Sequence, residues 1–147
     1  MARTLGIDYG EKRIGLALSD ATGTVATPYR VIDATSRKAA IRNIVECVAE
    51  LGIERIVIGL PLRMDGTQGP SAEKTLAFAE QLKPELTIPV EAWDERFSTM
   101  TAENALIEGG TRRAKRKQHV DKLAAQIFLQ HYLDVQAGIP PTIPDPS

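Results

Sequence analysis

The chain has 147 residues, about the length of one domain, and its 43% hydrophobic and 25% charged residues are ordinary for a soluble globular protein. A formal net charge of −1 excludes a protein that coats nucleic acid by overall charge, so polyanion binding would depend on a local patch. One cysteine excludes a disulfide framework and a cysteine-rich zinc site. No signal-peptide pattern opens the chain and no run reaches membrane-spanning length, so we expect a cytoplasmic protein with no membrane partner.

The start of the chain predicts three strands joined by short turns. They span 4–8, 13–19 and 25–31, and the first is an apolar run that ends on Asp8. Strands joined in this way form an antiparallel meander. Pro28 lacks the N–H that a central strand would donate, so we expect the third strand at an edge of the sheet.

From residue 36 onward, helices alternate with strands. The expected elements are a helix that Ser36 caps and Gly52 ends, a buried strand over 55–59, a loop over 60–70, a helix that Ser71 caps and that ends before Pro84, a strand over 88–93, a helix from Ser98 or Thr99 to near Gly109, a basic link over 112–117 and a last helix. The proline-rich residues 138–147 predict a disordered tail after a single domain over 1–137.

This order of elements predicts an α/β fold. Right-handed crossovers after a meander give a five-stranded mixed sheet of order 3-2-1-4-5 with helices on both faces. Ligands bind such sheets outside the carboxyl ends of the strands. Asp8, the corner made by Gly59 and Pro61, and the pair Asp94 and Glu95 all fall at those ends.

Three acids are the candidate catalytic residues. Carboxylates packed together repel one another and stay ionised only if cations join them. Two divalent ions held by such oxygens activate a water and neutralise the leaving group in phosphodiester cleavage. We therefore expect Asp8, Glu95 and Asp121 to hold Mg²⁺ or Mn²⁺. Simpler roles stay open: an Asx turn for Asp8, a surface partner of Arg96 for Glu95 and a helix-start acid for Asp121.

A concentrated basic run is the candidate nucleic-acid contact. It comprises Arg112, Arg113, Lys115, Arg116 and Lys117 in a nearly neutral protein. Such a run is a local footprint for a polyanion, although a solvated loop is the alternative. Four more cations are expected near the same edge of the sheet, where they would bind phosphates without reading the base sequence: Lys12, Arg13, Arg63 and Arg96. His131 has a simpler explanation as a core histidine with its hydrogen bonds satisfied.

Four motifs stand in order along the chain: Leu5 to Gly10 with Arg13 to Gly15, Gly59 to Pro61 with Asp65-Gly66, Asp94 to Arg96 with Ser98-Thr99, and Val120-Asp121 with Ala124-Ala125. Together they resemble the YqgF family of small bacterial RNase H-like proteins, relatives of the RuvC Holliday-junction resolvases. The resemblance implies an RNase H-like fold, a divalent-metal nuclease and an acidic triad of Asp8, Glu95 and Asp121. Gly10, Gly59, Pro61 and Ser98 would support that site structurally.

The resemblance also implies a substrate. The proposed role of the family is maturation of the 5′ end of the 16S ribosomal RNA precursor, which would make RNA the partner, on a ribosome-assembly particle. An older proposal is resolution of branched DNA. A resolvase-like acid three residues after Asp121 is replaced by Ala124, which argues against junction resolution more than against nuclease activity. We expect a monomer or a weak dimer.

Three other functions are open. A phosphotransferase of the actin-like ATPase and sugar-kinase class begins with a similar Asp-x-Gly hairpin but needs two such domains. A non-catalytic RNA-binding factor in ribosome assembly or transcription would keep its RNA affinity after Asp8→Asn. A junction resolvase requires a symmetric dimer that presents two sites.

Overall fold

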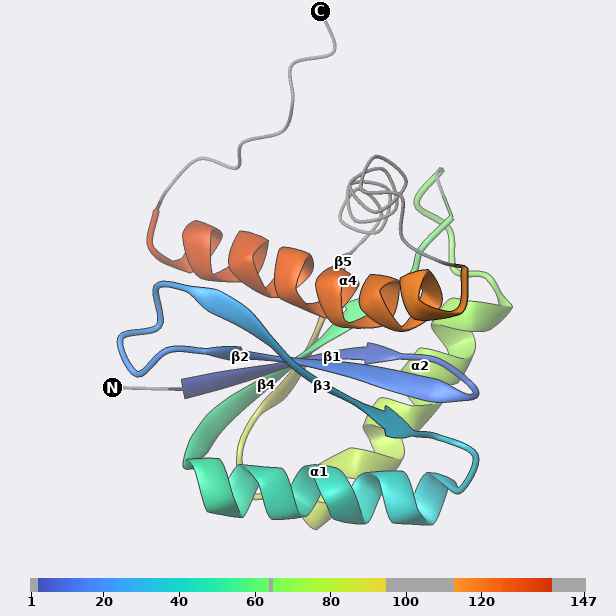
Figure 1. Ribbon diagram of the computed structural model, residues 1–147, viewed down its shortest axis with the longest axis horizontal. Coiled ribbons are helices and arrows are strands. Elements are labelled where there is room, and N and C mark those ends of the chain that lie inside the picture. Colours follow the sequence, from blue (N-terminus) through green and yellow to red (C-terminus); the bar gives the residue numbers. More distant parts are fainter. Residues whose placement is uncertain (1–2, 64, 95–112, 139–147) are drawn as a thin grey trace, which may run out of the picture.

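The computed structural model describes residues 3–63, 65–94 and 113–138 of the chain (Figure 1). Its elements are β1 (Arg3–Tyr9), β2 (Arg13–Ser19), β3 (Ala26–Asp33), α1 (Arg37–Leu51), β4 (Ile53–Leu60), α2 (Pro70–Leu82), η1 (Lys83–Glu85), β5 (Val90–Asp94) and α4 (Arg113–Gln136). β3 extends beyond the predicted 25–31, and β5 begins later than predicted. The helix predicted from residue 98 and the tail from 139 lie outside the described residues. None of the helices in the described ranges could cross a membrane.

The five strands form one mixed sheet in the predicted order β3-β2-β1-β4-β5. β1 is central because it pairs antiparallel with β2 and parallel with β4. β3 pairs with β2 at the edge, where Pro28 stands opposite Ala17 beside a shift in register. An edge strand tolerates proline because one of its sides needs no ladder hydrogen bonds. The predicted edge position is confirmed.

Helices cover both faces of the sheet, as predicted (Figure 1). α1 and α2 cover one face, where Leu5 and Ile7 of β1 are buried in the larger core. α4 covers the other face, and its Leu129 belongs to a second core cluster. Successive side chains of a strand point to opposite faces, so Gly6 and Asp8 lie on the α4 side of β1.

α1 begins and ends at the residues that the sequence predicts. Ser36 precedes the helix in an extended conformation, and its Oγ accepts a hydrogen bond of 3.2 Å from the N–H of Ala39. Gly52 ends the helix in the left-handed conformation (φ 65°) and donates its N–H to the carbonyl of Val48. These residue types satisfy the backbone groups that a helix end leaves without partners.

α2 begins two residues earlier than predicted. Gly69 is its N-cap, Pro70 is its first residue, and no side chain caps it, so the expectation that Ser71 caps the helix is wrong. The ring of Pro70 already holds the backbone in a helical φ, and its missing N–H is not needed in the first turn. The predicted end before Pro84 is confirmed, since α2 stops at Leu82 and Pro84 lies in η1.

α4 begins at Arg113, so the basic residues 113–117 are helical rather than a link. Arginine, lysine and alanine are good helix formers, and residues 118–120 include no capping residue that would start the helix later. The earlier start also corrects the position of Asp121. This residue lies about two turns into the helix instead of in its first turn.

Gly6 allows α4 to approach the sheet closely. A Cβ at this position would lie 3.1 Å from Cβ of Leu129 and 3.4 Å from the carbonyl oxygen of Ala125. We expect Gly6→Ala to lower the free energy of unfolding by about 1–3 kcal/mol, because α4 must move away. Urea denaturation measures this loss. In a double-mutant cycle, Leu129→Ala should relieve part of the cost, and strictly additive losses would contradict the contact.

Candidate active site

Three parallel strands end side by side at one edge of the sheet. Asp8 is the residue before the last of β1, β4 ends at Leu60, and β5 ends at Asp94. Ile7 pairs with Ile58, and Leu60 pairs with Asp94, so the strand ends stand at similar heights. The carboxyl ends of these strands therefore lie together, as the sequence predicts, at the edge where α/β sheets bind ligands.

Asp8 lies on the α4 side of this edge. Its side chain is half-buried, and its neighbour on β2 is Gly15, which adds no side chain over it. A half-buried carboxylate keeps its charge only when hydrogen-bond donors, water or a cation compensate for the lost hydration. The position therefore suits a residue that meets a ligand where α4 and the strand end face each other.

α4 runs antiparallel to β1 across this face (Figure 1). The helix passes Gly6 at Ala125, whereas Tyr132 lies beside the beginning of β4. From Ala125 back to Asp121 the helix rises about 6 Å, and from Gly6 to Asp8 the strand advances about 6.6 Å. The backbone of residue 121 therefore comes over the end of β1 that carries Asp8.

Several predicted site residues lie outside the part of the chain that the structure describes. They are Glu95, Arg96, Ser98 and Arg112. For residues 113–122, which include Asp121 and the other basic residues of the run, the backbone is described and the side chains are not. Among the described side chains, no three acids, histidines or cysteines gather closely enough to hold a metal ion. The acidic triad therefore stays a prediction. The structure describes Asp8 in full and only the backbone of Asp121.

The turn between β1 and β2 requires the predicted glycine. A Cβ on Gly10 would lie 2.6 Å from the carbonyl oxygen of Arg13, a distance that the backbone does not allow. The turn is also tied to the link between β3 and α1, because the carbonyl of Lys12 accepts a hydrogen bond of 3.0 Å from the N–H of Ala34. Lys12 and Arg13, two predicted phosphate contacts, thus stand on a rigid turn just after Asp8.

The loop between β4 and α2 places Arg63 at the start of α2. Its N–H donates to the carbonyl of Thr67 at 2.9 Å, and its carbonyl accepts from Gly66 at 2.7 Å. The exposed guanidinium lies against Gly69, where a Cβ would come within 2.9 Å of Nε. Pro61 follows the end of β4 at the beginning of this loop. Arg63 therefore lies at the predicted edge of the sheet.

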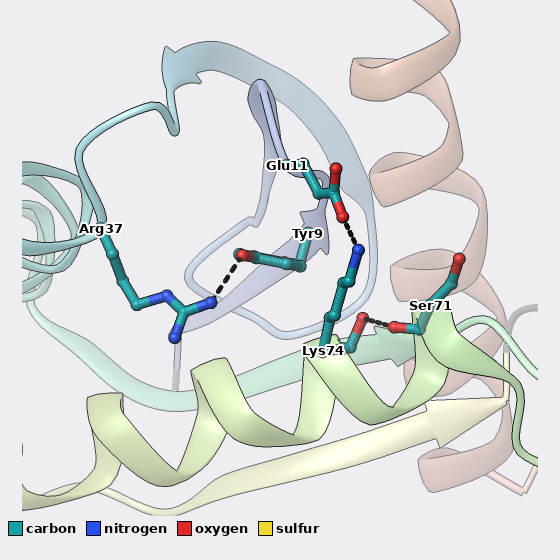
Figure 2. Close-up of polar contacts among 6 residues, drawn as sticks. Tyr9, Glu11, Arg37, Ser71 and Lys74 are labelled. Atoms are coloured by element: carbon teal, nitrogen blue, oxygen red, sulfur yellow. Dashed lines mark hydrogen bonds and ion pairs between the residues drawn. The ribbon is translucent and has the colours of Figure 1, made fainter.

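A group of polar residues beside this edge was missed by the sequence analysis (Figure 2). Arg37 donates a hydrogen bond of 3.3 Å to the hydroxyl of Tyr9, and Lys74 of α2 forms an ion pair with Glu11. Figure 2 shows that these pairs join the end of β1 and the turn that follows it to both helices of that face. One signal was available, since α1 starts with Arg37 and Lys38 and has no acid in its first turn.

Comparison with known proteins relates this arrangement to enzymes. A family model described as RuvX, Holliday junction resolvase, matches residues 2–135. A Symbiobacterium thermophilum protein named "Putative pre-16S rRNA nuclease" is 47% identical over 136 residues, 92% of this chain and 94% of that protein. A protein of the same name from Caldanaerobacter subterraneus subsp. tengcongensis is also 47% identical, over 91% of this chain and 97% of its own length.

The chain belongs to the RuvX family. This membership confirms the YqgF resemblance, since both names denote the same family. A resolvase and a pre-rRNA nuclease both hydrolyse phosphodiester bonds, so the enzyme class of this RuvX chain is a nuclease.

Solved structures confirm the RNase H-like fold. Thermus thermophilus RuvC in complex with a Holliday junction substrate aligns with a TM-score of 0.60 at 16% identity, over 94% of this chain and 97% of RuvC. The fowlpox virus resolvase with junction DNA aligns with a TM-score of 0.54 at 13% identity, over 91% and 98% of the two chains. Identities this low establish a shared fold and leave the substrate open.

In this RuvX chain, a network at the other end of α4 ties the helix to β4 and β5. Tyr132 is buried, and its hydroxyl accepts from Nη1 of Arg55 at 2.5 Å and donates to Oε1 of Glu91 at 3.0 Å. Burial raises the pKa of Tyr132, so its hydroxyl stays protonated near neutral pH and remains a donor. Trp93 packs edge-on against Tyr132, with 5.1 Å between ring centroids. The network secures the edge strand that leads to Glu95.

His131 also belongs to this network. Its Nδ1 accepts a hydrogen bond of 3.3 Å from Nε1 of Trp93, and the two rings meet edge to face. The side chain is half-buried. His131 is therefore a structural histidine that is hydrogen-bonded to Trp93, but it is half-buried and not in the core as the sequence predicts.

Proposed function

We propose that this RuvX chain is a divalent-metal-dependent nuclease that cleaves RNA and matures the 5′ end of the 16S ribosomal RNA precursor. The observation that carries the proposal is the position of Asp8, half-buried at the carboxyl end of the central strand, on the face that α4 covers. The names of the 41–47% identical relatives support the substrate. A cytoplasmic location and a monomeric or weakly dimeric state are part of the same proposal.

Asp8, Glu95 and Asp121 are the residues that we propose hold Mg²⁺ or Mn²⁺. Carboxylate oxygens are the ligands that these hard cations prefer. The antiparallel course of α4 supports the grouping, because it brings the backbone of residue 121 over the strand end of Asp8. When bound, such ions activate a water and neutralise charge on the leaving oxygen.

The basic residues beside the acids would hold the RNA so that the bond to be cut lies at the acids. Lys12 and Arg13 stand on the turn that follows Asp8, and Arg63 stands at the start of α2. Their cations can bind phosphates on either side of the cleaved bond, which positions the bond without selecting a sequence. Binding and cleavage are therefore expected to depend on different side chains.

The test is cleavage of precursor RNA by the purified protein. We expect a new 5′ end to form with Mn²⁺ or Mg²⁺ and no product to form in EDTA. Primer extension on the products locates the cut. A product that forms equally well in EDTA would overturn the metal dependence, and an uncut precursor with either metal would overturn the nuclease proposal for this substrate.

The basic run makes a separate prediction. Replacement of Arg112, Arg113, Lys115, Arg116 and Lys117 by glutamine should weaken binding of all RNA sequences to a similar degree. The slope of log K against log salt should also become flatter, by about 0.7 for each phosphate of a single strand that the variant no longer binds. Fluorescence anisotropy over a salt series measures both effects. A weakening confined to particular RNA sequences would contradict the proposed binding to the RNA backbone.

A second candidate function is resolution of branched DNA, which the description of the family and the structural match to RuvC support. Resolution requires a symmetric dimer, because two strands must be cut in a coordinated way. Four-way junction DNA offered together with precursor RNA, with sedimentation of the complexes, separates the two candidates. Paired symmetric cuts by a dimer would favour resolution.

A further inference from the structure

Three elements of the fold meet in a charged surface on the far side of β1 from Asp8 (Figure 2). We call this surface the polar rim and define it by Tyr9, Glu11, Arg37 and Lys74. Tyr9 and the β1–β2 turn contribute two of these residues, and α1 and α2 contribute one each. The ring of Tyr9 stacks on the ring of Phe78 of α2, with 4.6 Å between the ring centroids. The rim is therefore a surface on a rigid support.

The rim carries more positive than negative charge. Arg37 and Lys74 are exposed cations, whereas Glu11 is the one acid among the four. Lys74 and Glu11 keep 54% and 62% of their side chains exposed although they form an ion pair, so both remain accessible to a ligand. The one acid of β3, Asp33, accepts hydrogen bonds of 2.7 Å from both the N–H and the hydroxyl of Thr35.

The charge at the start of α1 is the reverse of what helix stability favours. A helix N-terminus favours acids, yet Arg37 and Lys38 occupy the first turn of α1 with no acid. Arg37 donates its hydrogen bond to the hydroxyl of Tyr9. Because this hydroxyl is uncharged, the contact does not neutralise the positive charge of Arg37. A phosphate at the rim would compensate for both the cations and the positive end of the helix.

We propose that the polar rim is a second contact for the sugar–phosphate backbone of structured RNA, separate from the basic run of α4. The inference rests on the proposed function for the identity of the polymer. Asp8 and Tyr9 are consecutive in β1 and point to opposite faces of the sheet. An RNA strand that passes Asp8 on the α4 side would cross the β1–β2 turn and meet the rim next.

Glu11 and Lys74 give the proposal a sharp test. Glu11→Gln and Lys74→Gln both break the same exposed ion pair, so a purely structural role predicts the same small effect for the two variants. A phosphate contact predicts opposite effects. Removal of a negative charge should tighten RNA binding, and removal of a positive charge should weaken it, each by about two- to fivefold at low salt.

The experiment measures anisotropy of a fluorescein-labelled stem–loop RNA with single-stranded flanks. Wild type, the two variants and Arg37→Gln are compared in EDTA at several salt concentrations, with a gel to show that the RNA is intact. Glu80→Gln and Lys83→Gln are matched controls, because they break an exposed ion pair of 2.9 Å at the other end of α2. We expect the controls to leave binding unchanged and Arg37→Gln to weaken it.

Equal shifts for Glu11→Gln and Lys74→Gln, or no shift in either, would overturn the proposal. Opposite shifts with junction DNA but not with RNA would overturn the assignment of RNA as the ligand. Cleavage is measured separately with Mn²⁺. Opposite binding shifts in a protein that never cuts RNA would support the polar rim as a contact and count against the nuclease proposal. Normal cutting with no binding shift would support the nuclease proposal and overturn the polar rim as a contact.

Discussion

Asp8→Asn should reduce RNA cleavage by at least ~1000-fold, because bound metal contributes several kcal/mol to the transition state and each ~1.4 kcal/mol is a factor of ten in rate. Asparagine keeps the size of the side chain and removes the charge that a divalent cation requires. The change lies at the end of β1 on the half-buried face toward α4, so the sheet pairing of Asp8 with Gly15 can persist. Single-turnover cleavage of precursor RNA with Mn²⁺ measures the loss.

Binding measurements on the same variant decide between an enzyme and a non-catalytic RNA-binding factor. The nuclease proposal predicts that Asp8→Asn binds RNA about as well as wild type and unfolds at a similar urea concentration. A variant that still cleaves at a rate near wild type would show that Asp8 does not hold a catalytic metal. Asp20→Asn is a suitable control, because Asp20 lies in the β2–β3 turn, at the other end of the sheet from Asp8, and accepts hydrogen bonds from the hydroxyl of Thr22 and the N–H of Thr24.

Tyr132→Ala should lower the free energy of unfolding by about 3–5 kcal/mol, the usual cost of removing a buried aromatic side chain. Tyr132 is 1% exposed and packs against Trp93 in the core beneath α4. The substitution also removes the hydroxyl that links Arg55 to Glu91. Urea denaturation followed by circular dichroism measures the loss.

Tyr132→Phe separates the ring from the hydroxyl. It keeps the packing and removes the hydrogen bonds, so a loss of about 1 kcal/mol is expected. Arg55 and Glu91 retain 40% and 42% exposure of their side chains, so water can replace the missing hydroxyl. Equal losses for the alanine and phenylalanine variants would contradict a dominant role for ring burial.

Local chemistry made parts of the fold predictable from the sequence. Ser36 and Gly52 mark the two ends of α1, because a side-chain cap and a left-handed glycine act within a few residues of themselves. Pro28 marked the edge strand, because a missing N–H cannot be compensated in the middle of a sheet. The apolar runs that end on Asp8 and Asp94 placed these acids correctly at strand ends.

The starts of α2 and α4 were wrong because their residues suit more than one structure. Ser71 is a good cap, but Pro70 before it starts the helix equally well. Arg113 and the basic residues after it are tolerated in a solvated loop and in a helix alike. The lack of a capping residue at 118–120 was a signal for the earlier start of α4, but it is weak because a helix can begin without a side-chain cap, as α2 does.

By itself, the sequence determined the class of fold, the family and the strand ends that carry the candidate acids, because these depend on strand and turn patterns and on short motifs along the chain. Only the tertiary structure decided that Arg37 meets Tyr9 and Lys74 meets Glu11, residues 28 and 63 positions apart. It also decided that α4 passes directly over Gly6. Such contacts depend on how helices pack across a twisted sheet, and the geometry of that packing is set by many side chains at once.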